Sequence, residues 1–466
     1  MNSEASVLLP DLRRESLLDS RKKPNNQNPT ERAARVGAGA IAPPDGLPHA
    51  RKSSCPFILG QHSEPLMNVL PGQASSTEGP VQRDPFLRIQ VLVFALVAAV
   101  FTTVYIPQPV LPVLRLEFGV AEGVASRTVS AVVLGMALAN LPFGALADRL
   151  PIRRILLTGG LVVAICGLAS ALAPSLEWLV AARFVQGLFI PALTTCLAAY
   201  LARVMPVGRL NVVMGTYVSA TVLGGLSGRL LAGVLMPAAH WRWAFFLASA
   251  LLIAAALAAY AGLPVEPDEG PVARDTTRFR DVLLRHDLIR LYAVGAGAYF
   301  VFSSIFNYLP FYLYGAPFHW STRAVTLLYL SYVMGVVAGP LAGRLSNRIG
   351  NGTAMVVGTL VLGGGVALTL VPRGWAMAAA LTLVCAGFFT VHAAAAGALN
   401  RKLQAGRGRA NAFYVLFYYL GGAAGITLSG HGYHARGWHG VVALCAAALL
   451  VPLSTGFMER RAAGRA

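Results

Sequence analysis

The sequence predicts an all-α integral membrane protein with twelve transmembrane helices arranged as two similar six-helix halves. Three observations predict this class. Of the 466 residues, 56% are hydrophobic and only 12% are charged, which is about half the charged share of soluble domains. Apolar runs recur along the chain, each near the roughly 20 residues that a helix needs to cross a bilayer. The two halves also repeat the same loop and glycine patterns.

The first segment differs from the rest. Residues 1–86 are polar, rich in Pro, Asn, Ser and Arg, and have no sustained apolar period. Such a segment cannot bury enough apolar surface to offset its ordering entropy, so we expect a disordered N-terminal tail. Translation from Met67 would leave most of this tail out of the protein.

The apolar runs fall into two groups of six. We expect an N-terminal six-helix bundle over residues 87–263, a polar linker over 264–289, a C-terminal six-helix bundle over 290–458 and a short tail over 459–466. The predicted helices lie near 89–112, 126–147, 155–173, 178–202, 210–236, 243–263, 291–314, 323–343, 353–372, 376–399, 410–430 and 438–456. An even number of crossings leaves both ends of the chain on one side of the membrane.

The distribution of basic residues orients the helices. Lys and Arg concentrate in cytoplasmic loops. With the N-terminus inside, the inner loops, the linker and the C-terminus hold 19 of them, and the outer loops hold six. We therefore expect both termini, tail and linker in the cytoplasm, and the Arg-, Ala- and Gly-rich composition suggests a bacterial inner membrane. The net charge of +18 does not indicate nucleic acid, because no basic helix interleaved with aromatics is present.

Internal correspondences connect the two halves. The loop after the second run reads Gly144-Ala-Leu-Ala-Asp148-Arg149, and the loop after the eighth reads Gly343-Arg-Leu-Ser-Asn347-Arg348. The glycine spacing of the fifth run, from Gly224 to Gly233, returns in the eleventh from Gly421 to Gly430. A duplicated membrane chain of this kind is typical of transporters whose site lies between the repeats.

These stretches resemble the major facilitator superfamily over nearly all of 88–458. The stretch from Gly144 to Arg154 resembles its loop motif Gly-x-x-x-Asp-Arg-x-Gly-Arg-Arg/Lys, although Pro151 and Ile152 replace the Gly-Arg pair. Arg183-Phe-Val-Gln186-Gly187 resembles its Arg-x-x-Gln-Gly motif, and Trp241-Arg-Trp243 is similar to the start of its sixth helix. The resemblance implies the major facilitator fold and alternating access, with runs 1, 4, 7 and 10 around a central cavity.

Three further details are similar to the YnfM-type bacterial efflux permeases of that superfamily. They are Tyr105-Ile-Pro-Gln108-Pro-Val-Leu-Pro112, Gly224-Gly-Leu-Ser-Gly228-Arg229 and Tyr418-Tyr419-Leu-Gly421-Gly422. Arg229 stands where many drug/proton antiporters of the superfamily have a Gly-Pro motif. This departure counts against a multidrug antiporter.

Two arginines are the charged residues deep inside the predicted helices, away from the helix ends. Arg183 lies in the fourth run and Arg229 in the fifth, whereas none of the 20 acidic residues lies inside a run. Charges within the bilayer are costly and usually functional. Either Arg183 binds an anionic substrate, or both arginines bond main-chain carbonyls and hold the bundle together. The sequence leaves both readings open.

Other candidates concern coupling and gating. His392 is the histidine deepest inside a run, and histidine titrates near neutral pH, so it is the candidate for proton coupling unless it is simply packed. Asp148 can accept hydrogen bonds from a neighbouring helix N-terminus and latch an inner gate. We expect Gly144, Asp148 and Arg149 to form this gating motif, with Asn347 and Arg348 at the matching place in the second half. Ordinary solvated loop charges are the alternative.

The remaining candidates are polar and aromatic residues that would line the cavity and set selectivity, unless they are interfacial or core: Gln186, Tyr299, Asn307, Tyr418 and Tyr419. His431, His434 and His439 fall in the last predicted outer loop, where three histidines without an acid or cysteine are more typical of a solvated loop than of a metal site. We expect no metal and no cofactor.

The expected function is that of a secondary-active transporter that moves a small organic solute by alternating access, by efflux, with proton coupling left open. The alternative is an importer or exchanger of organic anions that uses Arg183, and a remote one is a non-transporting membrane sensor. An enzyme is not expected, since no convergent catalytic set or nucleotide-binding motif is present. The expected partners are the solute, an anion among the options, protons and the lipid bilayer. Nucleic acid is not expected, and the protein is expected to be a monomer.

Overall fold

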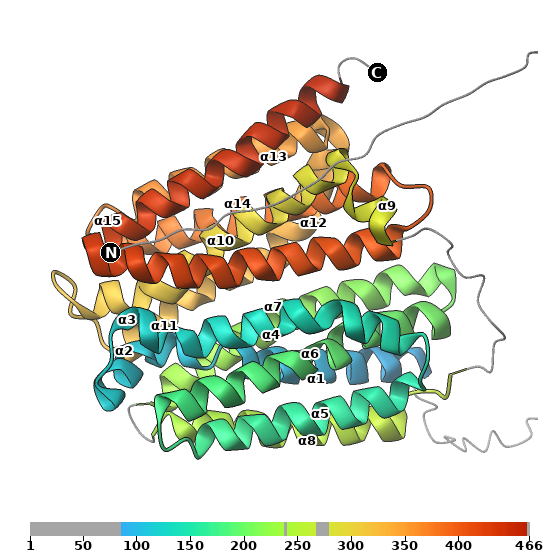
Figure 1. Ribbon diagram of the computed structural model, residues 1–466, viewed down its shortest axis with the longest axis horizontal. Helices are drawn as coiled ribbons and strands as arrows, with labels where there is room; N and C mark the ends of the chain where they lie inside the picture. The colour runs from blue at the N-terminus through green and yellow to red at the C-terminus, as the bar shows by residue number, and fades with distance from the viewer. Residues whose placement is uncertain (1–84, 237–239, 267–278, 464–466) are drawn as a thin grey trace, which may run out of the picture. The chain divides into compact units, whose positions relative to one another are not determined.

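The computed structural model describes residues 85–236, 240–266 and 279–463. The predicted N-terminal tail therefore lies almost entirely outside the described residues. Within these ranges the regular elements are all helices (Figure 1). Eleven helical segments are long and apolar enough to cross a membrane, and the last of them contains two helices. The described chain thus has the twelve crossings that the sequence predicts, numbered 1 to 12 below.

The first half contains crossings 1 to 6. Crossing 1 is made of two helices separated by Tyr105 and Ile106, and a single turn of helix precedes crossing 2. In order, the elements are α1 (Pro85–Val104), α2 (Pro107–Phe118), α3 (Glu122–Ala125), α4 (Arg127–Ala147), α5 (Ile152–Ala171), α6 (Leu176–Val204), α7 (Val207–Leu235) and α8 (Arg242–Gly262).

The second half contains crossings 7 to 12. Its elements are α9 (Phe279–Leu283), α10 (His286–Tyr314), α11 (Thr322–Leu328), the 3₁₀ helix η1 (Tyr329–Tyr332), α12 (Val333–Ile349), α13 (Asn351–Leu368), α14 (Gly374–Arg401) and α15 (Arg407–Ala463). Helix α9 lies within the predicted linker, and α10 begins at His286, before the predicted boundary at 290. Segments α11, η1 and α12 together form crossing 8.

The long helix α15 is two crossings joined by a tight reversal. Arg436 (φ −141°) and Gly437 (φ 57°) are not helical, and glycine adopts a positive φ without a Cβ penalty. Next to the reversal the backbones of the two helices touch, since a Cβ added at Gly440 would collide with the main chain of Gly432. Crossing 11 therefore runs from Arg407 to Ala435, and crossing 12 begins at Trp438.

This reversal corrects one prediction. His431, His434 and His439 do not lie in an outer loop but on the helical turns beside Arg436 and Gly437. The predicted loop is wrong because a two-residue turn with a left-handed glycine replaces it. Among the described residues no three His, Cys, Asp or Glu side chains are grouped as metal ligands.

The repeated glycines let crossings pack closely in the same way in both halves. Gly224 and Gly228 of α7 face the main chain of α1, where an added Cβ would collide with the main chain of Ala98 and Thr102. The equivalent Gly421 and Gly425 of α15 face the main chain of α10. Small residues let the backbones of membrane helices approach in this way. Close packing of α7 on α1 and of α15 on α10 therefore accounts for the repeated glycines.

Candidate functional site

A cavity of about 1590 Å³ lies between the two halves. Its walls come from crossings 1, 2, 4 and 5 of the first half and crossings 8, 10 and 11 of the second. It reaches the exposed residues Asp148 and Arg149 at one end of the helices, called here the Asp148 end. At the opposite end, called the Glu117 end, none of the described residues belongs to the lining.

The lining differs from the arrangement that the family resemblance implies. Crossing 7 contributes no lining residue, because its Tyr299 lies behind other tyrosines. The hydroxyl oxygens of Tyr299 and Tyr105 are 2.6 Å apart, and the Tyr299 ring is stacked on Tyr418 with a centroid separation of 4.0 Å. Tyr105 and Tyr418 do line the cavity.

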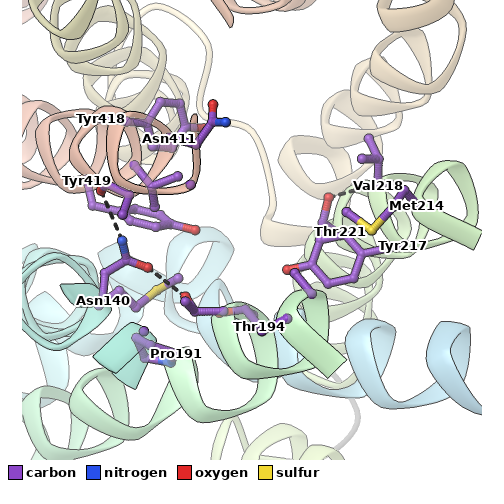
Figure 2. A pocket seen from close by; sticks show the side chains of 18 of the residues that line it. Asn140, Pro191, Thr194, Met214, Tyr217, Val218, Thr221, Asn411, Tyr418 and Tyr419 are labelled. Atoms are coloured by element: carbon purple, nitrogen blue, oxygen red, sulfur yellow. Dashed lines mark hydrogen bonds between the residues drawn. The ribbon is translucent and has the colours of Figure 1, made fainter. Parts of the chain in front are cut away.

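The deep part of the cavity is aromatic and hydroxyl-bearing. Figure 2 shows Tyr418 and Tyr419 on one wall and Tyr217 on another, with Asn140 and Thr194 on neighbouring helices. Asn140 of α4 donates to the carbonyl oxygen of Ala412 on α15 at 3.1 Å. It also accepts from the hydroxyl of Thr195 at 2.6 Å. Asn140 therefore connects the two halves at the cavity wall, a role that the sequence analysis missed.

Charged lining residues gather at the Asp148 end. They are Asp148, Arg149, Arg203, Glu266 and Arg409. Deeper in, the lining offers rings, hydroxyls, amides and His392 of α14. The Nδ1 atom of His392 is 3.0 Å from the hydroxyl of Tyr414, and its ring is stacked on Phe388 with a centroid separation of 6.0 Å. The structure thus places His392 at the cavity, as a proton-coupling residue requires.

Arg183 does not line the cavity and is fully buried. Its Nε donates to the carbonyl of Thr128 at 3.2 Å and its Nη1 to the carbonyl of Thr103 at 2.7 Å. Nη1 also donates to Gln186 Oε1, and Nη2 to the carbonyl of Val104. Each nitrogen of the guanidinium therefore has a partner from crossings 1, 2 or 4.

Two of the carbonyl partners of Arg183, those of Thr103 and Val104, lack a helical donor because of Pro107 in crossing 1. In an unbroken helix the carbonyl of Thr103 would accept from residue 107, but Pro107 has no N–H. The N–H of Gln108 bonds the carbonyl of Tyr105 at 3.2 Å, which leaves the carbonyl of Val104 without its helical donor. Arg183 replaces both donors. This bonding favours the structural role over substrate binding.

Gln186 belongs to the same buried group rather than to the cavity lining. Its Nε2 donates to the carbonyl of Val163 in α5 at 3.0 Å, and its Oε1 accepts from Arg183. The motif from Arg183 to Gln186 thus links crossings 1 to 4.

Arg229 lies between the two halves and is also fully buried. Its Nε donates to Gln108 Oε1 at 2.7 Å, and its Nη1 donates to the carbonyl of Gly225 at 2.6 Å. Its Nη2 donates to the hydroxyl of Tyr332 in the second half at 2.7 Å. The guanidinium carbon is 4.1 Å from the ring centroids of both Tyr105 and Tyr332, within cation–π range.

The Glu117 end is closed by contacts between the halves. Asn307 is fully buried there, not at the cavity, and its Nδ2 donates to Ser126 Oγ at 2.8 Å. A Cβ added at Gly123 would lie 3.4 Å from the Cα of Gly430. Asn307 and Arg229 therefore belong to the closure of the Glu117 end.

The loop motif at the Asp148 end is connected within each half. Arg203 Nη2 lies 3.1 Å from Asp148 Oδ1, and Arg401 Nη2 donates to Asn347 Oδ1 at 2.7 Å. Both arginines end the fourth helix of their half, so the repeat in the sequence could have identified them as partners. Gly144 and Arg149 line the cavity mouth, whereas Arg348 is exposed outside the lining.

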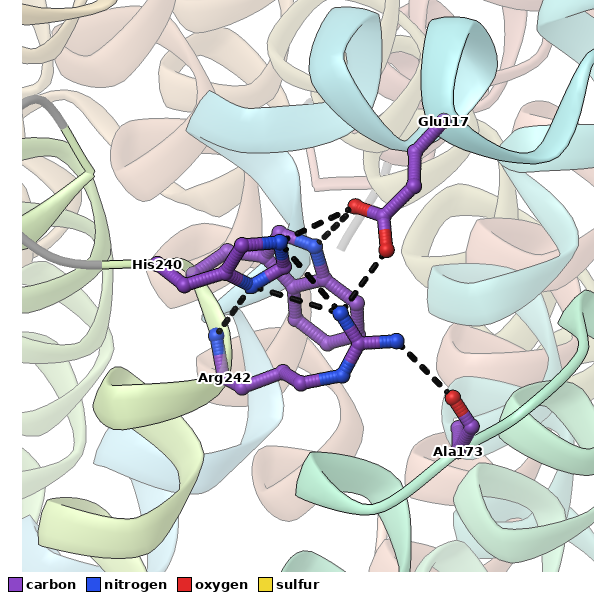
Figure 3. A network of polar contacts seen from close by, with 5 residues as sticks. Glu117, Ala173, His240 and Arg242 are labelled. Carbon is purple, nitrogen blue, oxygen red and sulfur yellow. Dashed lines mark hydrogen bonds and ion pairs between the residues drawn. The ribbon is translucent and has the colours of Figure 1, made fainter.

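A polar network ties together the first half at the Glu117 end (Figure 3). Glu117 Oε2 accepts from Trp241 Nε1 at 2.6 Å, and Glu117 Oε1 accepts from Arg242 Nη1 at 2.8 Å. Nη2 of Arg242 donates to the carbonyl of Ala173 at 2.9 Å. The network joins the ends of crossings 1 and 3 to the start of crossing 6.

Comparisons with known proteins agree with this architecture. The Major Facilitator Superfamily profile matches residues 93–400 and 315–462. The chain is 32% identical over 375 residues to the Inner membrane transport protein YnfM of Escherichia coli (strain K12), covering 80% of the chain and 90% of YnfM. It is 26% identical over 377 residues to the Uncharacterized MFS-type transporter YybF of Bacillus subtilis (strain 168), covering 79% and 93%.

Solved structures show the same fold. A bacterial homolog of the human lysosomal transporter Spinster, in an inward-facing and unoccupied conformation, matches with a TM-score of 0.70 at 14% identity. The match covers 82% of this chain and 98% of that one. The chain therefore belongs to the major facilitator superfamily and is a multi-pass membrane transporter of the YnfM type.

Proposed function

We propose that the protein is a secondary-active exporter of a small, mainly apolar organic solute in a bacterial inner membrane. The observation that carries the proposal is the cavity of about 1590 Å³ between the halves, lined in its depth by aromatic rings, hydroxyls and amides. Such a lining binds an apolar body through the rings and orients it with a few hydrogen bonds.

We infer export from the orientation of the open cavity. The excess of basic residues in the loops at the Asp148 end supports a cytoplasmic location for that end and for both termini. A cavity that reaches the surface at the Asp148 end then takes up its solute from the cytoplasm. Release requires the Glu117 end to open and the Asp148 end to close.

The gating motif supports this closure. Gly408 and Arg409, at the start of α15, line the same cavity mouth as Asp148 and Arg149. As the mouth narrows, the carboxylate of Asp148 approaches the N-terminus of α15, where main-chain N–H groups favour an anion. In the second half Asn347 is neutral, so this latch is stronger on the first half.

Coupling to protons is assigned to His392. It is the histidine of the cavity lining, and it contacts Tyr414 and the ring of Phe388. A proton taken up there changes the charge next to the solute, which ties solute binding to the proton gradient. The transporter works as a monomer, since both halves of the cavity come from one chain.

The alternative of anion import through Arg183 has less support. Arg183 is fully buried and each of its nitrogens already donates to a carbonyl or to Gln186. To bind Arg183, a solute anion would have to displace the carbonyls of Thr103 and Val104, which have no other donor.

The test begins with the detergent-purified protein and a panel of aromatic acids, sugars and cationic drugs. Solutes that raise the melting temperature are then assayed for accumulation in inside-out vesicles with and without a proton gradient. We expect accumulation, and we expect Tyr419→Ala to weaken it while Ala at the exposed Tyr314 leaves it unchanged. Uptake only into right-side-out vesicles, or equal effects of the two substitutions, would refute the proposal.

A further inference from the structure

The contacts of Arg229 are divided between the two halves of the transporter. Gln108, Gly225 and Tyr105 belong to the first half, and Tyr332 belongs to crossing 8 in the second half. None of the ion pairs found among the described residues includes Arg229. A fully buried guanidinium is therefore stabilised by uncharged groups, and two of the three aromatic rings around it, those of Tyr329 and Tyr332, come from the second half.

The position of Arg229 relative to the cavity is equally specific. Tyr105 lines the cavity, and the Arg229 guanidinium lies 4.1 Å behind the centroid of its ring. The second buried arginine, Arg183, adds charge of the same sign in the same half. Among the residues that the structure describes, no carboxylate lines the deep part of the cavity. The deep part of the cavity, next to Tyr105, thus has a positive electrostatic potential. Its surroundings have a low dielectric constant, so charges there are screened little.

Opening of the Glu117 end changes the surroundings of Arg229. Because alternating access separates the halves at this end, Tyr332 moves away from Arg229 together with crossing 8. Nη2 then loses its acceptor, and one aromatic face of the guanidinium becomes uncovered. Gln108 and the carbonyl of Gly225 stay on the first half. The donor that remains free faces the space from which the solute leaves.

We infer that Arg229 is a state-dependent anion site, and that the exported solute is an organic carboxylate with an apolar, aromatic-sized body. The carboxylate takes the place of the Tyr332 hydroxyl on Nη2, and the apolar body lies against Tyr105, Tyr418 and Tyr419. Charge-assisted hydrogen bonds of a guanidinium to a carboxylate are stronger than those to a neutral hydroxyl. The inference rests on the proposed export function and specifies its substrate class.

The exchange of Tyr332 for a carboxylate also orders the transport cycle. In the loaded protein the solute compensates for the lost Tyr332 contact, so the Glu117 end opens at low cost. In the empty protein the contact between Arg229 and Tyr332 favours return to the state that loads from the cytoplasm. An exporter gains from this difference, because opening without solute is disfavoured.

The experiment measures the opening of the Glu117 end directly. Spin labels are placed by Glu177→Cys and Arg373→Cys, which are exposed and lie at that end in different halves. Cys55, outside the described residues, is replaced by Ser, and the four described cysteines are buried. Distances are recorded by double electron–electron resonance in lipid nanodiscs, alone and with benzoate or its neutral isostere benzamide.

We expect benzoate, but not benzamide, to increase the long-distance population of the wild type. Tyr332→Phe removes one hydrogen bond to a charged donor and should raise the open-to-closed ratio about tenfold without solute. The control is Tyr314→Phe. Tyr314 is exposed at the last residue of α10, so this substitution should not change the open-to-closed ratio. Arg229→Gln should abolish the preference for benzoate, and Arg229→Lys should retain part of it.

Other results overturn the inference. It is wrong if benzoate has no effect on the wild type, if benzamide acts equally, or if Arg229→Gln keeps the benzoate preference. If Arg229→Gln does not fold, Tyr332→Phe and Arg229→Lys decide the question with the same criteria. Transport of carboxylates at wild-type rates by Arg229→Gln would refute the anion site and leave the export function standing.

Discussion

Replacing Arg183 tests whether this arginine holds crossing 1 or binds solute. Arg183→Met keeps much of the side-chain volume and removes the donors to the carbonyls of Thr103, Val104 and Thr128. The carbonyl of Thr128 keeps its helical partner in α4, whereas those of Thr103 and Val104 have none. A buried carbonyl without a partner costs about 1–3 kcal/mol, so these two cost about 2–6 kcal/mol. Removal of the desolvated guanidinium offsets part of this, so we expect a net loss of about 2–4 kcal/mol.

The assay is thermal unfolding of the detergent-purified variant, followed by size-exclusion chromatography after heating. A loss of about 2–4 kcal/mol corresponds to an apparent melting temperature lower by roughly 3–8 °C in a chain of this size. Arg183→Lys keeps a charge and three donors but not the fork geometry, so it should fall between the wild type and Arg183→Met.

A second substitution makes the explanation specific. Pro107→Ala supplies an N–H in the position that can bond the carbonyl of Thr103. In the Arg183→Met background it should recover about 1 kcal/mol, and in the wild type it should gain nothing. The reasoning would be refuted if Arg183→Met melted within about 1 °C of the wild type while solute binding was lost. That outcome would return Arg183 to the role of a binding residue.

Three further predictions follow from other contacts. Asp148→Asn should slow transport severalfold in vesicles yet change stability by less than about 1 kcal/mol, because the carboxylate is 77% exposed; a wild-type rate would remove Asp148 from the gate. His392→Ala should remove the dependence of transport on a proton gradient, measured as uptake at several external pH values, and an unchanged dependence would assign coupling elsewhere. Gly135→Ala should destabilise the protein by about 1–3 kcal/mol, because the added Cβ would lie 2.6 Å from the carbonyl oxygen of Phe184. Its control is Gly364→Ala, which has open space around it and should leave the melting temperature the same or raise it; equal melting of the two variants would contradict the packing argument.

The crossings could be predicted from the sequence because their signal is local. An uninterrupted run of about 20 apolar residues predicts a membrane helix, and the repeat of Gly224 to Gly233 in the second half indicated the six-plus-six arrangement. The same locality explains the error near His431. Polar residues suggested a loop, whereas the two-residue reversal at Arg436 and Gly437 lets the helix continue beside them.

The roles of the two buried arginines could not be read in the same way. The partners of Arg183 are main-chain carbonyls, which no side chain encodes, and the available signal was the absence of an N–H at Pro107. Tyr332 meets Arg229 from the other half of the chain, so only the tertiary structure brings them together. For the cavity, Tyr418, Tyr419 and His392 were predicted by residue type, while the contact of Asn140 across the halves was not.

The reversal between crossings 11 and 12 has a practical consequence for work on this transporter. Its two-residue connection and the main-chain contact of Gly432 with Gly440 leave little room for the two helices to shift. We therefore expect crossings 11 and 12 to move together as a rigid hairpin. A tag, fluorophore or antibody epitope inserted at Gly437 would separate the two helices of this hairpin. Reporters of the transport cycle are better placed on exposed turns elsewhere. An antibody fragment bound at this reversal should slow transport by restraining crossings 11 and 12.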